Sequence, residues 1–139
     1  MSFYRILPLA ITGLIVSACS ESFSVDEQTK TRIDCFSSKT VMTIANRVHE
    51  GTQAGIDPNI LSGIRIEEID DSLAILKAAG INGEAATYFE FETARRLNAM
   101  QDALRAREPE TLAFQVDTDA YKIMTETQEM AETCQFEVE

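Results

Sequence analysis

Three cysteines and one histidine, Cys19, Cys35, Cys134 and His49, are the residues of this chain best suited to metal or nucleophilic chemistry. Both kinds of chemistry need partner residues at fixed spacings. The chain has no C-x-x-C, H-E-x-x-H, G-x-S-x-G or S-x-x-K motif, and one histidine completes no zinc ligand set. We therefore expect no enzyme, no metal and no cofactor. His49 is interpreted as a surface residue near a helix end, where the helix dipole favours a cation.

The N-terminus has the plan of a secretory signal. Arg5 is the one charged residue before an apolar core over residues 6–16, and small residues follow it. A membrane-spanning helix needs about 20 apolar residues, so this stretch is too short for a permanent span. We expect a cleaved signal peptide over residues 1–18.

The run Val16-Ser17-Ala18-Cys19 resembles the lipobox of bacterial lipoprotein precursors. This resemblance covers only residues 1–19 and implies cleavage before Cys19 and palmitate-type acylation of that cysteine. Two or more acyl chains anchor a protein stably to a membrane. Ser20, in the position where the enteric-type sorting rule has Asp for inner-membrane retention, favours the outer membrane. Alternatively, an ordinary signal peptidase cuts after Ala18 and releases a soluble protein with a free Cys19.

An odd number of cysteines in an exported protein needs an explanation. Lipidation of Cys19 leaves Cys35 and Cys134 as an even pair, and export leads to an oxidising compartment where disulfides persist. We therefore expect a Cys35–Cys134 disulfide that closes nearly the whole mature chain. Residues 19–25 then form a lipidated tether, and residues 26–139 form the folded domain.

Two helices are predicted in the first half of this domain. The first spans about residues 26–50, with Ser24 and Glu27 as a capping box. The second begins at Asp57-Pro58, is interrupted at Gly63 and is strongest over residues 67–79, before a glycine cap at Gly80. Its apolar stripe consists of Ile66, Ile69, Leu73 and Leu76.

Two further helices are predicted, over about residues 84–107 and 110–134, with Pro109 between them. Their apolar residues recur at three- and four-residue steps, and no segment alternates as a strand does. Short connections favour antiparallel neighbours. We therefore predict an all-α, antiparallel up-down four-helix bundle closed by the disulfide.

The chain is acidic, with 23 Asp and Glu against 12 Lys and Arg and a net charge of −11. This charge disfavours binding to nucleic acid and direct attraction to anionic lipid. The densest acidic cluster consists of Glu67, Glu68, Asp70 and Asp71. It is either an acid-rich, solvated helix start or a docking patch for a cationic partner.

Four aromatic residues lie off the apolar stripes: Tyr88 and Phe91 on the third predicted helix, and Phe114 and Tyr121 on the fourth. Either the stripes are wider than the pattern indicates, or these side chains form exposed partner-binding surfaces. Antiparallel packing would place the two pairs at opposite ends of the bundle.

Together these features predict a periplasmic or envelope lipoprotein that reaches the membrane through its lipid and acts as a non-enzymatic protein-binding module. A specific version is an immunity or inhibitor protein whose acidic face blocks a basic toxin or hydrolase. The alternative is a structural accessory subunit of an envelope assembly or secretion system that uses the aromatic residues.

Overall fold

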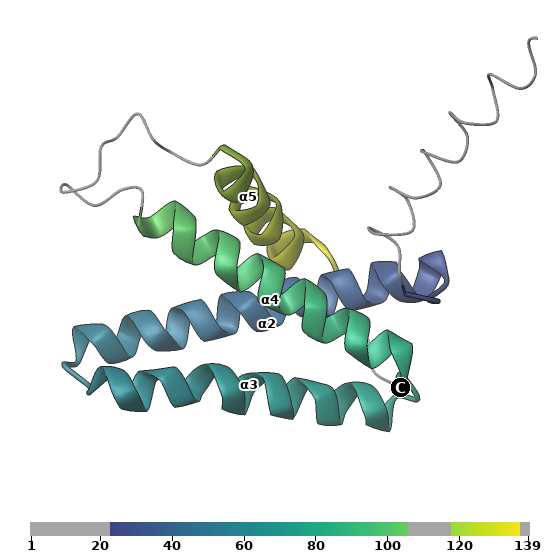
Figure 1. Cartoon of the computed structure of the whole chain (residues 1–139), viewed down its shortest axis with the longest axis horizontal. Coiled ribbons are helices and arrows are strands. Elements are labelled where there is room, and N and C mark those ends of the chain that lie inside the picture. Colours follow the sequence, from purple (N-terminus) through teal and green to yellow (C-terminus); the bar gives the residue numbers. More distant parts are fainter. Residues whose placement is uncertain (1–22, 106–117, 137–139) are drawn as a thin grey trace, which may run out of the picture.

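The computed structural model describes residues 23–105 and 118–136 (Figure 1). Within these ranges the chain forms four helices and no strand, which confirms the all-α prediction. The helices are α2 (Glu27–Gln53), α3 (Pro58–Ala78), α4 (Glu84–Arg105) and α5 (Thr118–Thr133). Cys19, Phe114 and the predicted start of the fourth helix at residue 110 lie outside the described residues.

The start of α2 differs from the predicted capping box. Asp26 is the N-cap, and its carboxylate accepts a hydrogen bond from the Thr29 backbone N–H at 2.9 Å. This hydrogen bond holds the pKa of Asp26 below its usual value. Ser24 lies two residues before the N-cap of a helix that begins at Glu27, so the predicted capping box was wrong. The Ser24 backbone N–H donates instead to the Glu84 carboxylate at the start of α4.

The start of α3 follows the predicted signal. Asp57 is the N-cap and accepts from the Asn59 backbone N–H at 2.8 Å, with Pro58 in the first turn. The predicted interruption at Gly63 was wrong, because α3 is continuous through it. A helical glycine costs only about 1 kcal/mol relative to alanine, and the burial of Leu61, two residues earlier, helps to offset that cost.

The end of α3 also matches the sequence. Gly80 has a left-handed φ of 83°, and the Ile81 backbone N–H donates to the Leu76 carbonyl at 2.9 Å. Ile81 and Leu76 are both buried, so their apolar contact fixes the turn from α3 into α4.

Helix α2 is the central element and contacts α3, α4 and α5. In Figure 1, α3 lies along α2 after a short turn, whereas α4 and α5 cross α2 at an angle. Helix α4 also contacts both α3 and α5. The three contacts of α2 explain why it carries much of the core.

The apolar core is divided into two clusters. The first cluster consists of Ile33, Leu76, Ile81 and Phe89. The second cluster consists of Val41, Ile44, Leu97, Met100, Ala103 and Met124. Buried polar residues lie between them along the helices, and we call these the polar layer: Ser37, Thr40, Ser72, Thr93 and Arg96.

The predicted disulfide is confirmed. Cys35 of α2 and Cys134, just after α5, are bonded with their Cα atoms 5.9 Å apart and 99 residues apart in sequence. Beyond it, Phe136 stacks on Phe36 with ring centroids 4.3 Å apart. The C-terminal end of the described chain is therefore fastened to α2 by one covalent and one aromatic contact.

Candidate functional site

The acidic cluster on α3 is divided between two roles. Glu68 and Glu67 approach the Arg47 guanidinium of α2 at 2.5 and 3.5 Å, and the hydrogen bond from Arg47 to Glu68 raises the pKa of Arg47. Asp70 and Asp71 are exposed, and no ion pair or hydrogen bond joins their side chains to the described part of the chain. Half of the predicted docking patch thus holds α3 against α2, and half is available to a partner.

Exposed isoleucines accompany these acids. Among the described residues, four of the six exposed large hydrophobic side chains lie on α3 or just before it: Ile56, Ile60, Ile66 and Ile75. Ile66 is 65% exposed, so its predicted place in the core stripe was wrong. Ile66 lies on a side of α3 that α2 does not cover. Ile66 lies one turn before Asp70, and Asp71 lies one turn before Ile75, so each exposed isoleucine has an acidic neighbour. The two pairs lie on opposite edges of the exposed side of the helix, and we call Ile66, Asp70, Asp71 and Ile75 the outer face of α3.

The off-stripe aromatics fall into different environments. Phe91 is 51% exposed, and Tyr88 is half-buried against the first cluster. The ring of Phe23 lies 5.6 Å from Tyr88 and 5.5 Å from Phe91, which links the segment before α2 to α4. Tyr121 on α5 is 44% exposed. Only Phe91 and Tyr121 therefore fit the predicted exposed aromatics.

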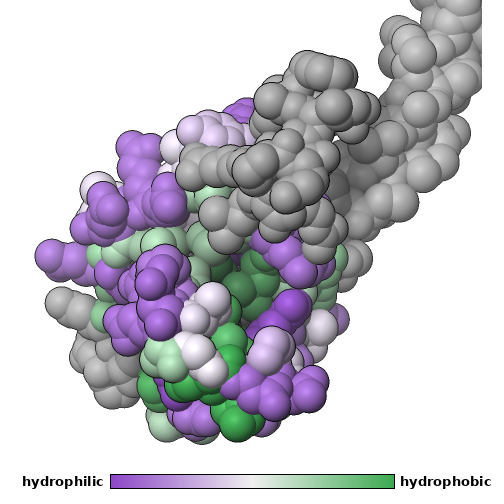
Figure 2. Space-filling view, turned by 90° about the vertical axis from the view of Figure 1, so that its left-hand side faces the viewer, coloured by the Kyte–Doolittle hydropathy of each residue, from purple (hydrophilic) through white to green (hydrophobic). Residues whose placement is uncertain are grey.

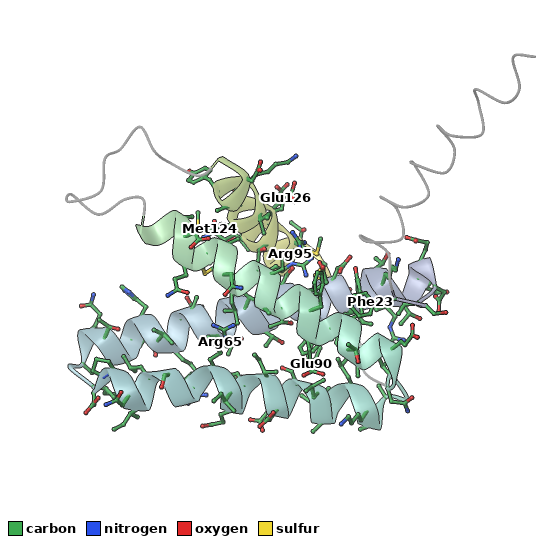
Figure 3. All side chains as sticks on the ribbon, in the orientation of Figure 1. Phe23, Arg65, Glu90, Arg95, Met124 and Glu126 are labelled. Atoms are coloured by element: carbon green, nitrogen blue, oxygen red, sulfur yellow. A yellow bond between two sulfur atoms is a disulfide. The ribbon has the colours of Figure 1, made fainter. Side chains whose placement is uncertain are left out.

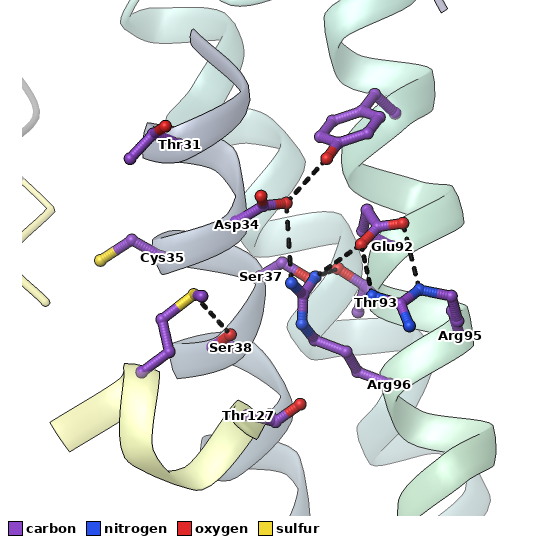
Figure 4. Close-up of polar contacts among 12 residues, drawn as sticks. Thr31, Asp34, Cys35, Ser37, Ser38, Glu92, Thr93, Arg95, Arg96 and Thr127 are labelled. Atoms are coloured by element: carbon purple, nitrogen blue, oxygen red, sulfur yellow. Dashed lines mark hydrogen bonds and ion pairs between the residues drawn. The ribbon is translucent and has the colours of Figure 1, made fainter. Parts of the chain in front are cut away.

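Tyr88 begins a buried chain of polar contacts (Figure 4). Its hydroxyl donates to Asp34 Oδ1 at 2.9 Å, and Asp34 lies 3.6 Å from the Arg96 guanidinium. Burial, followed by the hydrogen bond to Asp34, raises the pKa of Tyr88. Burial likewise raises the pKa of Asp34, against the opposing effects of Tyr88 and Arg96.

Arg96 joins this chain of contacts to the polar layer. Its guanidinium lies 3.2 Å from Glu92 and donates to Ser37 Oγ at 3.3 Å, and Ser37 Oγ lies 2.7 Å from Thr93 Oγ1. Among the described residues, every buried side-chain nitrogen or oxygen has a hydrogen-bond partner. The group is internally satisfied, so its chemistry is that of a structural brace rather than an open reactive site.

A groove opens at the end of the molecule where α2 turns into α3. It has a volume of about 600 Å³ and is bordered by α2, α3 and α4. Figure 2 looks at this end and shows hydrophobic residues in and below a hollow, between hydrophilic ones. Arg65 points from α3 toward α2 and α4 (Figure 3) and lines the groove together with His49.

Sequence reasoning missed this groove. Its apolar lining belongs to three separate helices, and periodicity alone does not reveal where two helices diverge. Arg65 was the available signal, because it is a basic residue between the apolar Leu61 and Ile69 of an otherwise acidic chain.

Among the described residues, no group of three or more His, Cys, Asp or Glu side chains is placed to hold a metal ion. None of the four helices is long and apolar enough to cross a membrane.

Comparisons with protein families, with curated proteins and with solved structures find no match to this chain.

Proposed function

We propose that this protein is an exported envelope lipoprotein, anchored through Cys19, that acts as a non-enzymatic module for binding another protein. The outer face of α3 is the contact surface. Its partner is cationic, and one version of that partner is a basic toxin or cell-wall hydrolase that this protein inhibits. The lipid holds the protein at the outer membrane, facing the periplasm.

The exposed isoleucines beside unpaired acids on α3 carry this proposal. Ile66 and Ile75 are 65% and 43% exposed, and Asp70 and Asp71 lie between them in sequence. Apolar surface mixed with charge is typical of protein-interaction sites, where burial supplies affinity and charge supplies specificity and speed of association.

We further propose the antiparallel up-down order for the bundle. The short turns at residues 54–57 and 79–83 support it, as does the disulfide from α2 to the end of α5. In this arrangement the tether reaches the membrane from the start of α2, and the outer face of α3 stays accessible from the side.

Site-specific photocrosslinking in intact cells tests the contact surface. A photoreactive amino acid at Ile66 should give one discrete protein adduct, and the same amino acid at exposed Gln128 on α5 should not. Reversing the charge at Asp70 and Asp71 to Lys should abolish the adduct. Equal adducts from both positions, or an adduct insensitive to charge reversal, would contradict the proposed surface.

Lipid anchoring has its own test. Cells fed labelled palmitate should incorporate label into the wild-type protein and not into a Cys19→Ala variant, which should leave the membrane fraction. Label retained in that variant would contradict anchoring at Cys19 while leaving the binding surface untested by this result.

A structural accessory subunit is the second candidate, because Phe91 and Tyr121 are exposed aromatic side chains at separate places on the bundle. Large assemblies need more than one contact surface per subunit. Ala at Phe91 and Tyr121 would then reduce co-sedimentation with a large envelope complex, whereas charge reversal on α3 would not.

A further inference from the structure

The groove between α2, α3 and α4 has an apolar floor. Ile44, Leu61, Leu97 and Met100 are buried side chains that line it, and Ala45 adds a small half-buried side chain from α2. Small-molecule sites have volumes of about 300–1,000 Å³ and are mostly apolar with a few polar groups. The volume of about 600 Å³ falls in that range.

The groove is elongated. Along α2 its lining runs from Ile44 to Thr52, which spans roughly 12 Å at 1.5 Å per residue. On α3 the lining runs antiparallel in sequence, from Pro58 at the outer end to Arg65. An apolar surface of this length accommodates an extended alkyl chain.

Arg65 is a cation that lines this surface and has no counterion among the described residues. Arg65 is half-buried, and no ion pair or hydrogen bond joins its side chain to residues 23–105 or 118–136. By contrast, the nearby Arg47 is paired with Glu67 and Glu68. In a chain with net charge −11, an unpaired guanidinium beside an apolar groove is complementary to an anionic head group.

We infer that the groove binds a single-chain carboxylic acid, with its carboxylate at Arg65 and its alkyl chain along Ile44, Val48 and Leu61. This site is separate from the outer face of α3, so it adds a ligand to the proposed protein-binding function. A carboxylate can accept two hydrogen bonds from an arginine guanidinium, and burial of the ligand's alkyl chain away from water is favourable. A cationic amphiphile would meet Arg65 with the wrong charge.

Photoaffinity labelling of the full chain in its own membranes tests this site. The probe is a diazirine-bearing dodecanoate, and its adducts are mapped by peptide mass spectrometry. We expect adducts on the groove segments of α2, α3 and α4, competed by dodecanoate and not by dodecyltrimethylammonium. Arg65→Gln should reduce labelling by about tenfold, the factor expected for one charge-assisted hydrogen bond.

Matched variants separate groove binding from general changes in the protein. Lys77→Gln removes an exposed cation elsewhere on α3 and should leave labelling unchanged. Ala45→Phe should fill the groove and abolish labelling, whereas Ala74→Phe, at an exposed position on the same bundle, should not. If Ala45→Phe unfolds, as judged by circular dichroism, the two charge-removing variants Arg65→Gln and Lys77→Gln still decide the question.

Three results would overturn the inference. The first is labelling that is absent in the wild type, as expected if a protein segment fills the groove. The second is labelling spread over the whole surface, as expected for partition from the membrane. The third is equal loss of labelling in Arg65→Gln and Lys77→Gln. None of these results bears on the crosslink from Ile66. The proposal for the groove and the proposal for the outer face of α3 can therefore be refuted independently.

Discussion

Ser37 Oγ of α2 and Thr93 Oγ1 of α4 lie 2.7 Å apart, and both residues are fully buried between the two apolar clusters. Thr40 Oγ1 and Ser72 Oγ form a similar pair between α2 and α3, 2.9 Å apart. Each pair is satisfied only when its two helices have one relative position along their axes. The polar layer therefore contributes to the alignment of the bundle as well as to its stability.

A double-mutant cycle on the first pair tests this idea. Thr93→Val removes one of the two partners of the Ser37 hydroxyl, which still accepts from Arg96. The free energy of unfolding should therefore fall by about 0.5–1.5 kcal/mol, the net contribution of one hydrogen bond. Ser37→Ala should cost less in the Thr93→Val background than in the wild type, because there it removes only the acceptor of Arg96 and not the contact with Thr93 as well. Urea unfolding of the four proteins gives the coupling energy, expected at about 0.5–3 kcal/mol. Strict additivity would show that the two hydroxyls do not stabilise each other.

The half-buried Asp34 carboxylate predicts a pH dependence of stability. Burial raises the pKa of Asp34 above its ordinary value of 3.8, so the folded protein holds this proton more tightly than the unfolded chain does. The stabilising contribution of the bound proton is present below pH 3.8. It is lost as the pH rises through the raised pKa of the folded state.

Asp34→Asn isolates this effect because it removes the titrating group and keeps an oxygen that can accept from Tyr88. The free energy of unfolding of wild type minus that of Asp34→Asn should increase as the pH falls from 7 toward 3.8. Urea titrations at a series of pH values measure it, with exposed Asp70→Asn as the control for general charge effects. A difference that decreases toward low pH would show that the pKa of Asp34 is not raised in the folded protein.

Local signals made much of the fold predictable. Asp57-Pro58 begins α3, Gly80 ends it with a positive φ, and the two cysteines left after Cys19 form the disulfide. The helix start and the helix end depend on the conformational preferences of single residues, and the disulfide depends on the even number of cysteines that remain. Such effects are visible in the sequence because they need no knowledge of how helices cross.

The candidate sites depend on helix crossing and were less predictable. Ile66 has the spacing of a core residue, yet it is 65% exposed because α2 covers a different side of α3. Arg65 lines the groove together with Leu97 and Met100 of α4, and no pattern within α3 indicates that these residues of another helix share its surface. Small polar residues such as Thr93 are neutral in a hydrophobic pattern, so the polar layer between the clusters had no sequence signature.

The disulfide should carry a large share of the stability. It joins two cysteines that are 99 residues apart in sequence. The chain-entropy model gives a stabilisation of about 4.7 kcal/mol for a loop of about 100 residues. Replacing Cys35 and Cys134 by Ala should lower the free energy of unfolding by about 2–5 kcal/mol in urea. Reducing agent should lower the wild-type value equally and leave the double variant unchanged. A reduced wild type as stable as the oxidised one would show that the bond is dispensable.

Replacement by Ala at two helical glycines, Gly51 and Gly63, should change the stability of the protein in opposite directions. A Cβ on Gly51 would lie 2.3 Å from Leu61 Cδ2, whereas a Cβ on Gly63 would meet nothing within 4 Å. Gly63→Ala should raise the free energy of unfolding by about 0.5–1 kcal/mol, because alanine is the better helix former.

Gly51→Ala gains the same helix propensity, but it forces Leu61 from its place between α2 and α3. Overpacking of this kind costs about 1–3 kcal/mol, so the net change should be destabilising. Because Leu61 lines the groove, the displaced side chain should also reduce dodecanoate labelling there, while Gly63→Ala leaves labelling intact. Thermal unfolding and the labelling yield of both variants measure the two effects. If both variants are more stable than the wild type, the Leu61 side chain can move at little cost in free energy. The close approach of α2 and α3 would then not require a glycine at position 51.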